Sequence, residues 1–132
     1  MKATATAKSA FFAKILKPGE EYAGIILGKN GEPDHHLILM PGQTTDVSWP
    51  QAKKFAAKAG GELPTRREQS LLFTNLKEQF KDRAYWSCAQ HASDPDYAWY
   101  QYFDDGLQGS YGTNGKFRAR AVRRVIILGE GL

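Results

Sequence analysis

Hydrophobic residues recur at helical spacing in two stretches near the middle of the chain. The residues on one face are Trp49, Ala52, Phe55, Ala56 and Ala59 in the first stretch, and Leu72, Leu76 and Phe80 in the second. Each stretch follows a residue that can cap a helix, Ser48 or Thr65, with a Gln or Glu three residues later. We therefore expect helices that begin after Ser48 and Thr65, the first of which ends at Gly60-Gly61.

Runs of β-branched, aliphatic and aromatic residues predict strands on both sides of these helices. The runs occupy residues 22–27, 36–40, 85–87, 98–103 and 117–128. The first two flank Gly28 to Gly31, whose Asn-Gly pair supplies the positive φ angles of a hairpin turn. Residues 107–116 are mostly Gly, Ser, Asn, Gln and Tyr, which indicates a loop. The order of strands, helices and strands predicts an α+β fold with a largely antiparallel sheet.

The first seventeen residues are rich in Ala and fit either a short amphipathic helix or an extended arm before Pro18-Gly19. Lys8 and Lys14 interrupt the apolar residues, so we expect no signal peptide and synthesis in the cytoplasm of a host cell. The expected organisation is one compact domain, in which residues 1–43 form the arm and a β-hairpin and residues 44–132 form the main part.

Charge is distributed unevenly along the chain, although its net value is only +4 at pH 7. The N-terminal seventeen residues carry four lysines and no acid, and four arginines lie near the C-terminus (Arg118, Arg120, Arg123 and Arg124). Between Arg83 and Lys116 there is no Lys or Arg, but there are four aspartates (Asp94, Asp96, Asp104 and Asp105). The lone Cys88 excludes an internal disulfide and any multi-cysteine metal site.

Aromatic residues concentrate in the same acidic region: nine of the sixteen lie within residues 85–117. Trp86, Trp99, Phe103 and Phe117 are expected in the core of a small sheet. Period-two alternation places Tyr100 and Tyr102 on the face opposite Trp99. Tyrosine beside Gly, Ser and Asn is typical of recognition surfaces, because Tyr offers a large contact area at low entropic cost.

Several polar groups have both a chemical and a structural interpretation. The four aspartates fit a calcium site, but Asp-Pro-Asp and Asp-Asp-Gly are also common turn sequences, which we favour. Glu32-Pro33-Asp34 resembles the sugar-binding tripeptide of calcium-dependent lectins, but lies far in sequence from the usual position of that tripeptide. Adjacent His35 and His36 point to opposite faces of a strand, so surface roles are expected and no metal is predicted.

A cysteine–histidine pair and the C-terminal arginines are further candidates for a functional site. Cys88 and His91 have the composition of a thiol nucleophile and its base, but no orienting group or oxyanion hole accompanies them, so we expect no catalysis. The C-terminal arginines could bind phosphate, yet alternation along the strand favours ion pairs with the aspartates of the loop region. Neither nucleic acid nor a membrane is expected as a partner.

Five segments in order resemble a family of bacterial and phage C-type-lectin-like domains, typified by the C-terminal domain of the collagen-like adhesin Lcl. They are Gly61-Glu-Leu-Pro-Thr-Arg-Arg-Glu68, Tyr85-Trp-Ser87, Ala98-Trp-Tyr100, Phe103-Asp-Asp-Gly106 and Arg120-Ala-Val-Arg123. The match covers residues 44–125, and the chain departs from the pattern at Cys88 and Ala119. More distantly, it is similar to formylglycine-generating enzymes, whose cysteine pair it lacks, and to retroelement-diversified receptor-binding proteins.

The resemblance implies a C-type-lectin-like fold, with two helices flanking a small twisted sheet and long loops before the last strand. It also implies a phage or prophage protein that binds a bacterial surface glycan or protein through loop residues 94–116, without cofactor or catalysis. The candidate ligand-binding residues are Tyr100, Tyr102, Asp104, Asp105, Gln108, Ser110, Tyr111 and Asn114. The alternative is a virion-associated assembly protein that contacts other phage structural proteins, or forms a homo-oligomer, through its N-terminal arm.

Overall fold

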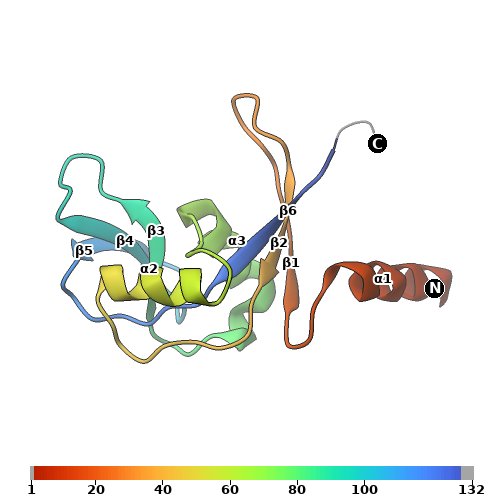
Figure 1. The fold of residues 1–132 in the computed structure, drawn as a ribbon, viewed down its shortest axis with the longest axis horizontal. Helices are drawn as coiled ribbons and strands as arrows, with labels where there is room; N and C mark the ends of the chain where they lie inside the picture. Colours follow the sequence, from red (N-terminus) through yellow and green to blue (C-terminus); the bar gives the residue numbers. More distant parts are fainter. Residues whose placement is uncertain (1, 129–132) are drawn as a thin grey trace.

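The computed structural model describes residues 2–128, with side chains from residue 7, and has an α+β fold (Figure 1). Its elements are α1 (Lys2–Ile15), β1 (Glu21–Ile26), β2 (His35–Leu39), α2 (Trp49–Lys58), α3 (Arg66–Leu76), the 3-10 helix η1 (Lys77–Gln79), β3 (Ala84–Gln90), β4 (Tyr97–Tyr102), β5 (Gln108–Gly112) and β6 (Val122–Ile126). Within this part of the chain, no helix is long and apolar enough to cross a membrane. The predicted α+β class is confirmed.

The first sheet has the strand order β1-β2-β6, with every pair antiparallel. The hairpin between β1 and β2 is confirmed, and its turn contains Asn30 and Gly31 at φ angles of 54° and 86°. Leu37 and Leu39 on β2 are fully buried on the face that packs against α3, where they join Leu72 in one core cluster. This burial holds the hairpin to the rest of the protein.

The outer edge of β1 lies beside α3, which supplies hydrogen-bond donors to it. Asn75 Nδ2 donates to the Ala23 carbonyl at 2.7 Å, and Arg67 Nη2 donates to the Leu27 carbonyl at 2.9 Å. The strand pairing shifts register between Tyr22 and Gly24, which marks a β-bulge at this edge. Side chains of α3 therefore donate to carbonyl groups that would otherwise accept hydrogen bonds from a further strand.

The second sheet has the order β3-β4-β5 and lies between two helices. Trp49, Ala52 and Ala56 of α2 pack with Trp86 and Ala98 on one face, whereas α3 contributes Leu72 to the cluster of Tyr85 and Phe103 on the other. Both predicted capping boxes are present, with Ser48 and Thr65 accepting from the backbone N–H three residues later. Trp86 and Phe103 are buried as expected, whereas Trp99 and Phe117 are only partly buried.

Two predictions about the last third of the chain were wrong. Residues 108–112, expected in a loop, form the edge strand β5, because their backbone pairs with β4 although their side chains are small or polar. The run 117–128 is not one strand. The carbonyls of Ala119 and Ala121 accept from the amides of Thr44 and Met40, which lie in the loop between β2 and α2, and only Val122–Ile126 joins a sheet. The chain thus crosses from one sheet to the other, and the fold has two small sheets and not one.

Helix α1 projects from the compact body, on the side away from the β3-β4-β5 sheet (Figure 1). Of the two interpretations of the N-terminal segment, the helical one is confirmed for Lys2–Ile15.

Candidate functional site

Three tyrosines gather on one face of the β3-β4-β5 sheet. Tyr100 and Tyr102 project from β4 with ring centroids 5.4 Å apart, and Tyr111 projects from β5. Tyr111 pairs across the strands with Ala98 and so lies on the same face as Tyr100, at a neighbouring position. We call Tyr100, Tyr102 and Tyr111 the tyrosine face.

Phe117 joins the tyrosine face to the protein core. Its ring centroid is 4.8 Å from that of Tyr100, 5.4 Å from that of Tyr111 and 4.8 Å from that of the buried Trp86. Phe117, which was expected in the core, therefore supports the tyrosine face. The sequence did not reveal this role, because Phe117 is far from β4 along the chain. Edge-on and tilted ring contacts thus connect Trp86 in the core to Tyr100 and Tyr111 at the surface.

Two glycines leave room for the tyrosine rings. A Cβ at position 109 would lie 2.8 Å from the Tyr100 hydroxyl oxygen, and a Cβ at position 115 would lie 2.5 Å from ring atom Cδ2 of Tyr111. Both distances are shorter than a normal carbon contact, so these rings rest directly on the Gly109 and Gly115 backbone. The tyrosine orientations are therefore restricted before any ligand arrives.

Exposure differs along the tyrosine face. Tyr111 is 53% exposed and Tyr102 is 41% exposed, whereas Tyr100 is partly buried between them and Phe117. Burial raises the pKa of Tyr100, with smaller contributions from the other two hydroxyl groups, so this phenol is neutral at physiological pH. The surface offers aromatic area and hydroxyl groups.

Of the other predicted site residues, Asn114 lies near the tyrosines and Ser110 does not. Asn114 is exposed in the turn that ends at Gly115, against which the Tyr111 ring packs. Ser110 pairs with Trp99 and so lies on the opposite face of the sheet. The structure therefore adds Asn114 to the tyrosine face and separates Ser110 from it.

Gln108 also lies on the opposite face, where it is held by hydrogen bonds. Its Nε2 donates to the Arg66 carbonyl at 2.8 Å and to Gln101 Oε1 at 2.9 Å, and its Oε1 accepts from Arg66 Nε at 2.9 Å. The Arg66 guanidinium carbon lies 3.6 Å from the ring centroid of the partly buried Trp99. Had residues 108–112 been predicted as a strand, alternation would have separated Gln108 from Tyr111.

The aspartates bond within their own turns, as favoured over calcium binding. Asp104 Oδ1 accepts from the Asp105 amide at 2.8 Å, Asp105 Oδ1 accepts from the Leu107 amide at 3.0 Å, and Asp94 Oδ1 accepts from the Asp96 amide at 3.1 Å. Asp104 and Asp105 remain exposed in the turn that follows Tyr102. Within residues 2–128, no three His, Cys, Asp or Glu side chains form a group that could hold a metal ion.

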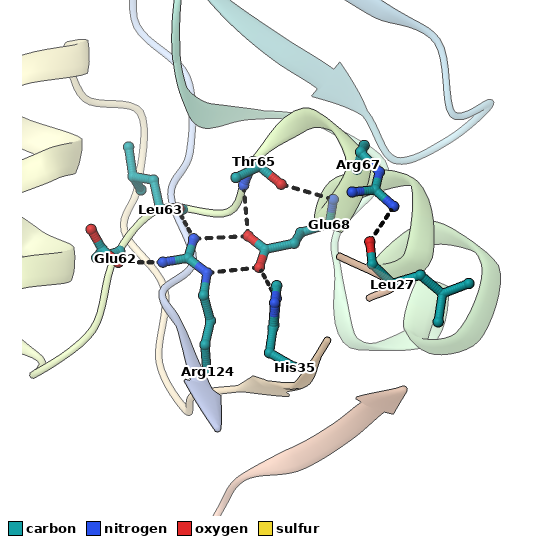
Figure 2. A network of polar contacts seen from close by, with 8 residues as sticks. All are labelled: Leu27, His35, Glu62, Leu63, Thr65, Arg67, Glu68 and Arg124. Atoms are coloured by element: carbon teal, nitrogen blue, oxygen red, sulfur yellow. Dashed lines mark hydrogen bonds and ion pairs between the residues drawn. The ribbon is translucent and has the colours of Figure 1, made fainter. Parts of the chain in front are cut away.

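A buried carboxylate, Glu68, forms a polar cluster between α3 and the β1-β2-β6 sheet (Figure 2). Its Oε1 accepts from the Thr65 amide and from Arg124 Nη2, both at 2.8 Å. Its Oε2 lies 2.7 Å from both Arg124 Nε and His35 Nε2. Burial alone would raise the pKa of Glu68, but the hydrogen bonds from Arg124 and Thr65 outweigh it and hold the pKa below its ordinary value. The cluster joins α3, β2 and β6, and each carboxylate oxygen has two partners.

In the part of the chain that the structure describes, two of the four C-terminal arginines form ion pairs, but their predicted partners were wrong. Arg124 pairs with Glu62 and Glu68, and Arg123 pairs with Glu20, so the acids are glutamates outside the loop region. Arg120 instead donates to the carbonyls of Gln79 and Met40. The aspartates were unavailable to these side chains because β6 belongs to the other sheet.

Cys88 and His91 do not form the hydrogen-bonded pair that a thiol nucleophile requires. His91 Nδ1 accepts from the amides of Ser93 and Asp94, and the His91 ring lies parallel to that of Trp99. Cys88 is exposed at the surface, but desolvation by the surrounding protein raises the pKa of its thiol. The thiol therefore stays protonated near neutral pH. Expected opposite orientations of His35 and His36 are confirmed: His35 contacts Glu68 and His36 Nδ1 contacts the Tyr22 hydroxyl at 2.8 Å.

Comparison with models of known protein families finds no family that matches this chain, and comparison with curated proteins finds no match.

Proposed function

We propose that the protein is a non-catalytic binding module whose tyrosine face contacts a bacterial surface glycan or protein. The observation that carries this proposal is the convergence of Tyr100, Tyr102 and Tyr111 on one face, supported from below by Phe117. Exposed aromatic rings are costly to leave in water, and a ligand that covers them gains the corresponding burial energy.

Preorganisation supports the same proposal. The rings of Tyr100 and Tyr111 rest on Gly109 and Gly115, so a ligand does not have to order them on binding. Asn114, next to Gly115 in the same turn, adds an exposed amide that can donate and accept hydrogen bonds. Flat rings beside an amide suit the apolar faces and hydroxyl groups of a sugar, and suit a peptide side chain equally.

The bacterial source of the ligand rests on the resemblance to C-type-lectin-like domains of phages and prophages. Placement of α2 and α3 on opposite faces of the β3-β4-β5 sheet supports that kinship. We therefore propose a C-type-lectin-like domain of phage or prophage origin.

The test compares tyrosines on the two faces of β4. Tyr97 and Tyr102 are equally exposed at 41%, but alternation along β4 puts Tyr97 on the face opposite the tyrosine face. Binding of the protein to bacterial cells and to an array of bacterial surface glycans is measured for Tyr102→Ala, Tyr111→Ala and the control Tyr97→Ala. We expect the first two to weaken binding at least about tenfold, as central aromatic contacts do, and the control to stay within about twofold.

Thermal unfolding of the same variants separates binding from folding. All three side chains are exposed, so each variant is expected to lose less than about 1 kcal/mol of unfolding free energy. Equal loss of binding in Tyr97→Ala, or unfolding of the Tyr102 and Tyr111 variants, would show that the tyrosine face is not a ligand surface.

A further inference from the structure

Helix α1 is held at a fixed angle to the body by its C-terminal end. The Arg123 guanidinium donates to the Ile15 carbonyl at 2.5 Å, and forms an ion pair with Glu20 Oε1 at 2.7 Å. Glu20 is buried, and one of its oxygens also accepts from the Lys17 amide at 2.8 Å. These contacts join β6, the linker and the last turn of α1, so the arm is a positioned element.

A groove of about 600 Å³ lies between α1 and the first sheet. Its walls are the rings of Phe11, Phe12, Tyr22 and His36, with Gly24 contributing no side chain to its floor. The Phe11 ring centroid is 5.5 Å from that of Tyr22 and 5.1 Å from that of His36, and both phenylalanines remain partly exposed. The Tyr22 hydroxyl and His36 Nδ1 bond to each other, which leaves a mainly apolar lining.

The charge at this groove has one sign. Lys8 is the charged residue that lines it, and the first seventeen residues contain Lys2, Lys8, Lys14 and Lys17 but no acid. Lys8 and Lys14 are exposed. A segment that enters the groove therefore meets aromatic rings and the ammonium group of Lys8.

We propose that this groove docks an acidic amphipathic helix of another protein, with apolar side chains packed against the rings of Phe11, Phe12 and Tyr22 and carboxylates beside Lys8. The short helix α1 would gain a neighbour along its length, since an isolated helix of this size is marginally stable in water. Charge complementarity favours this partner, because a helix with acids beside its apolar face can pair with Lys8.

The same features argue against two other occupants. Arm-to-arm association of two copies would bring the lysines of both arms together without an acid, which like-charge repulsion disfavours. A membrane would need an outward apolar face on α1, but the exposed side chains from residue 7 onward are Ala7, Lys8, Ser9, Ala10, Ala13 and Lys14. Phe11 and Phe12 face the groove instead.

The experiment uses the full chain and a labelled synthetic peptide that forms an amphipathic helix, with Leu and Phe on one face and Glu on the other. A second peptide has Lys in place of each Glu. Binding is measured by fluorescence anisotropy for the unmodified protein, for Lys8→Glu, and for Lys54→Glu, a matched charge reversal at an exposed position of α2. We expect the acidic peptide to bind, Lys8→Glu to weaken binding about tenfold, and Lys54→Glu to change it less than about twofold.

Several results would contradict the docking of an acidic helix in this groove. Failure of the acidic peptide to bind, equal binding of both peptides, or equal effects of the two charge reversals would overturn the proposal. So would a protein mass in solution that corresponds to arm-mediated dimers, or tighter binding to phosphatidylserine vesicles than to the peptide. Tyr102→Ala leaves the arm intact, so unchanged peptide binding by this variant would keep the groove independent of the tyrosine face.

Discussion

Replacement of Glu68 by Gln tests whether the buried carboxylate holds the β1-β2-β6 sheet to α3. The variant keeps the volume of the side chain but exchanges one carboxylate oxygen for an NH₂ group. Because both oxygens accept two hydrogen bonds, the new donor faces either Arg124 and Thr65 or Arg124 and His35. In each orientation, donors oppose donors at a position that has no access to solvent.

The expected loss follows from the burial of the two charges. The Glu68 side chain is 1% exposed and that of Arg124 is 23% exposed. Breaking a buried pair by removal of one charge costs about 3–5 kcal/mol, and Arg124 keeps Glu62 as a partner, so we expect about 3 kcal/mol. Glu62→Gln is the control, because its side chain is 72% exposed and its loss should cost less than about 1 kcal/mol.

The difference between the protein and Glu68→Gln should depend on pH. The pKa of Glu68 is lowered in the folded protein, so its stabilising contribution is present above the ordinary glutamate value of 4.5 and is lost as pH falls through the folded pKa. The two proteins should therefore differ most at neutral pH and converge in acid.

Urea unfolding at several pH values, followed by tryptophan fluorescence, measures both effects. In a separate thermal unfolding experiment at neutral pH, the expected loss corresponds to a decrease in Tm of about 10 °C for a domain of this size. An unfolding free energy within about 1 kcal/mol of the unmodified protein, or a difference that does not change with pH, would refute the role assigned to this cluster.

Three further predictions concern the loop region and the thiol. Millimolar calcium should change the Tm of the unmodified protein and of Asp105→Asn by less than about 1 °C, because the Asp105 carboxylate bonds its own turn; a calcium-dependent shift that Asp105→Asn removes would contradict this. Gly115→Ala should weaken ligand binding about as much as Tyr111→Ala, since the added Cβ displaces that ring; calorimetric titration with the bound ligand measures it. Cys88 should react with a thiol reagent at pH 7 more slowly than in the unfolded chain, as mass spectrometry can follow, because its pKa is raised.

Local signals in the sequence predicted most of the secondary structure. Ser48 and Thr65 fixed the two helix starts because a capping box depends on residues only three positions apart. Asn30 and Gly31 identified the hairpin because few residues tolerate positive φ. Strand β5 was missed because its Gly and Ser residues have low strand propensity, and it forms only through pairing with β4.

The residues of the candidate site were predicted correctly where their position depends on local sequence alone. Alternation along β4 correctly put Tyr100 and Tyr102 together, since it depends only on the backbone of one strand. The assignment of Gln108 to the same surface was wrong, because its face is set by register against β4. Long-range partners were also beyond local patterns: Arg123 and Glu20 are far apart in the chain, and only the folded sheet brings them together.

The donors that α3 supplies to the edge of β1 limit how this protein can associate with others. A bare strand edge is a template for pairing with another chain, which leads to aggregation at high concentration. Here Asn75 and Arg67 donate to the carbonyls of Ala23 and Leu27, and the bulge at Ala23 interrupts the regular pattern of hydrogen bonds along the strand. An incoming polypeptide at the edge of β1 meets the side chains of α3, so this edge is a poor template for extension of the sheet.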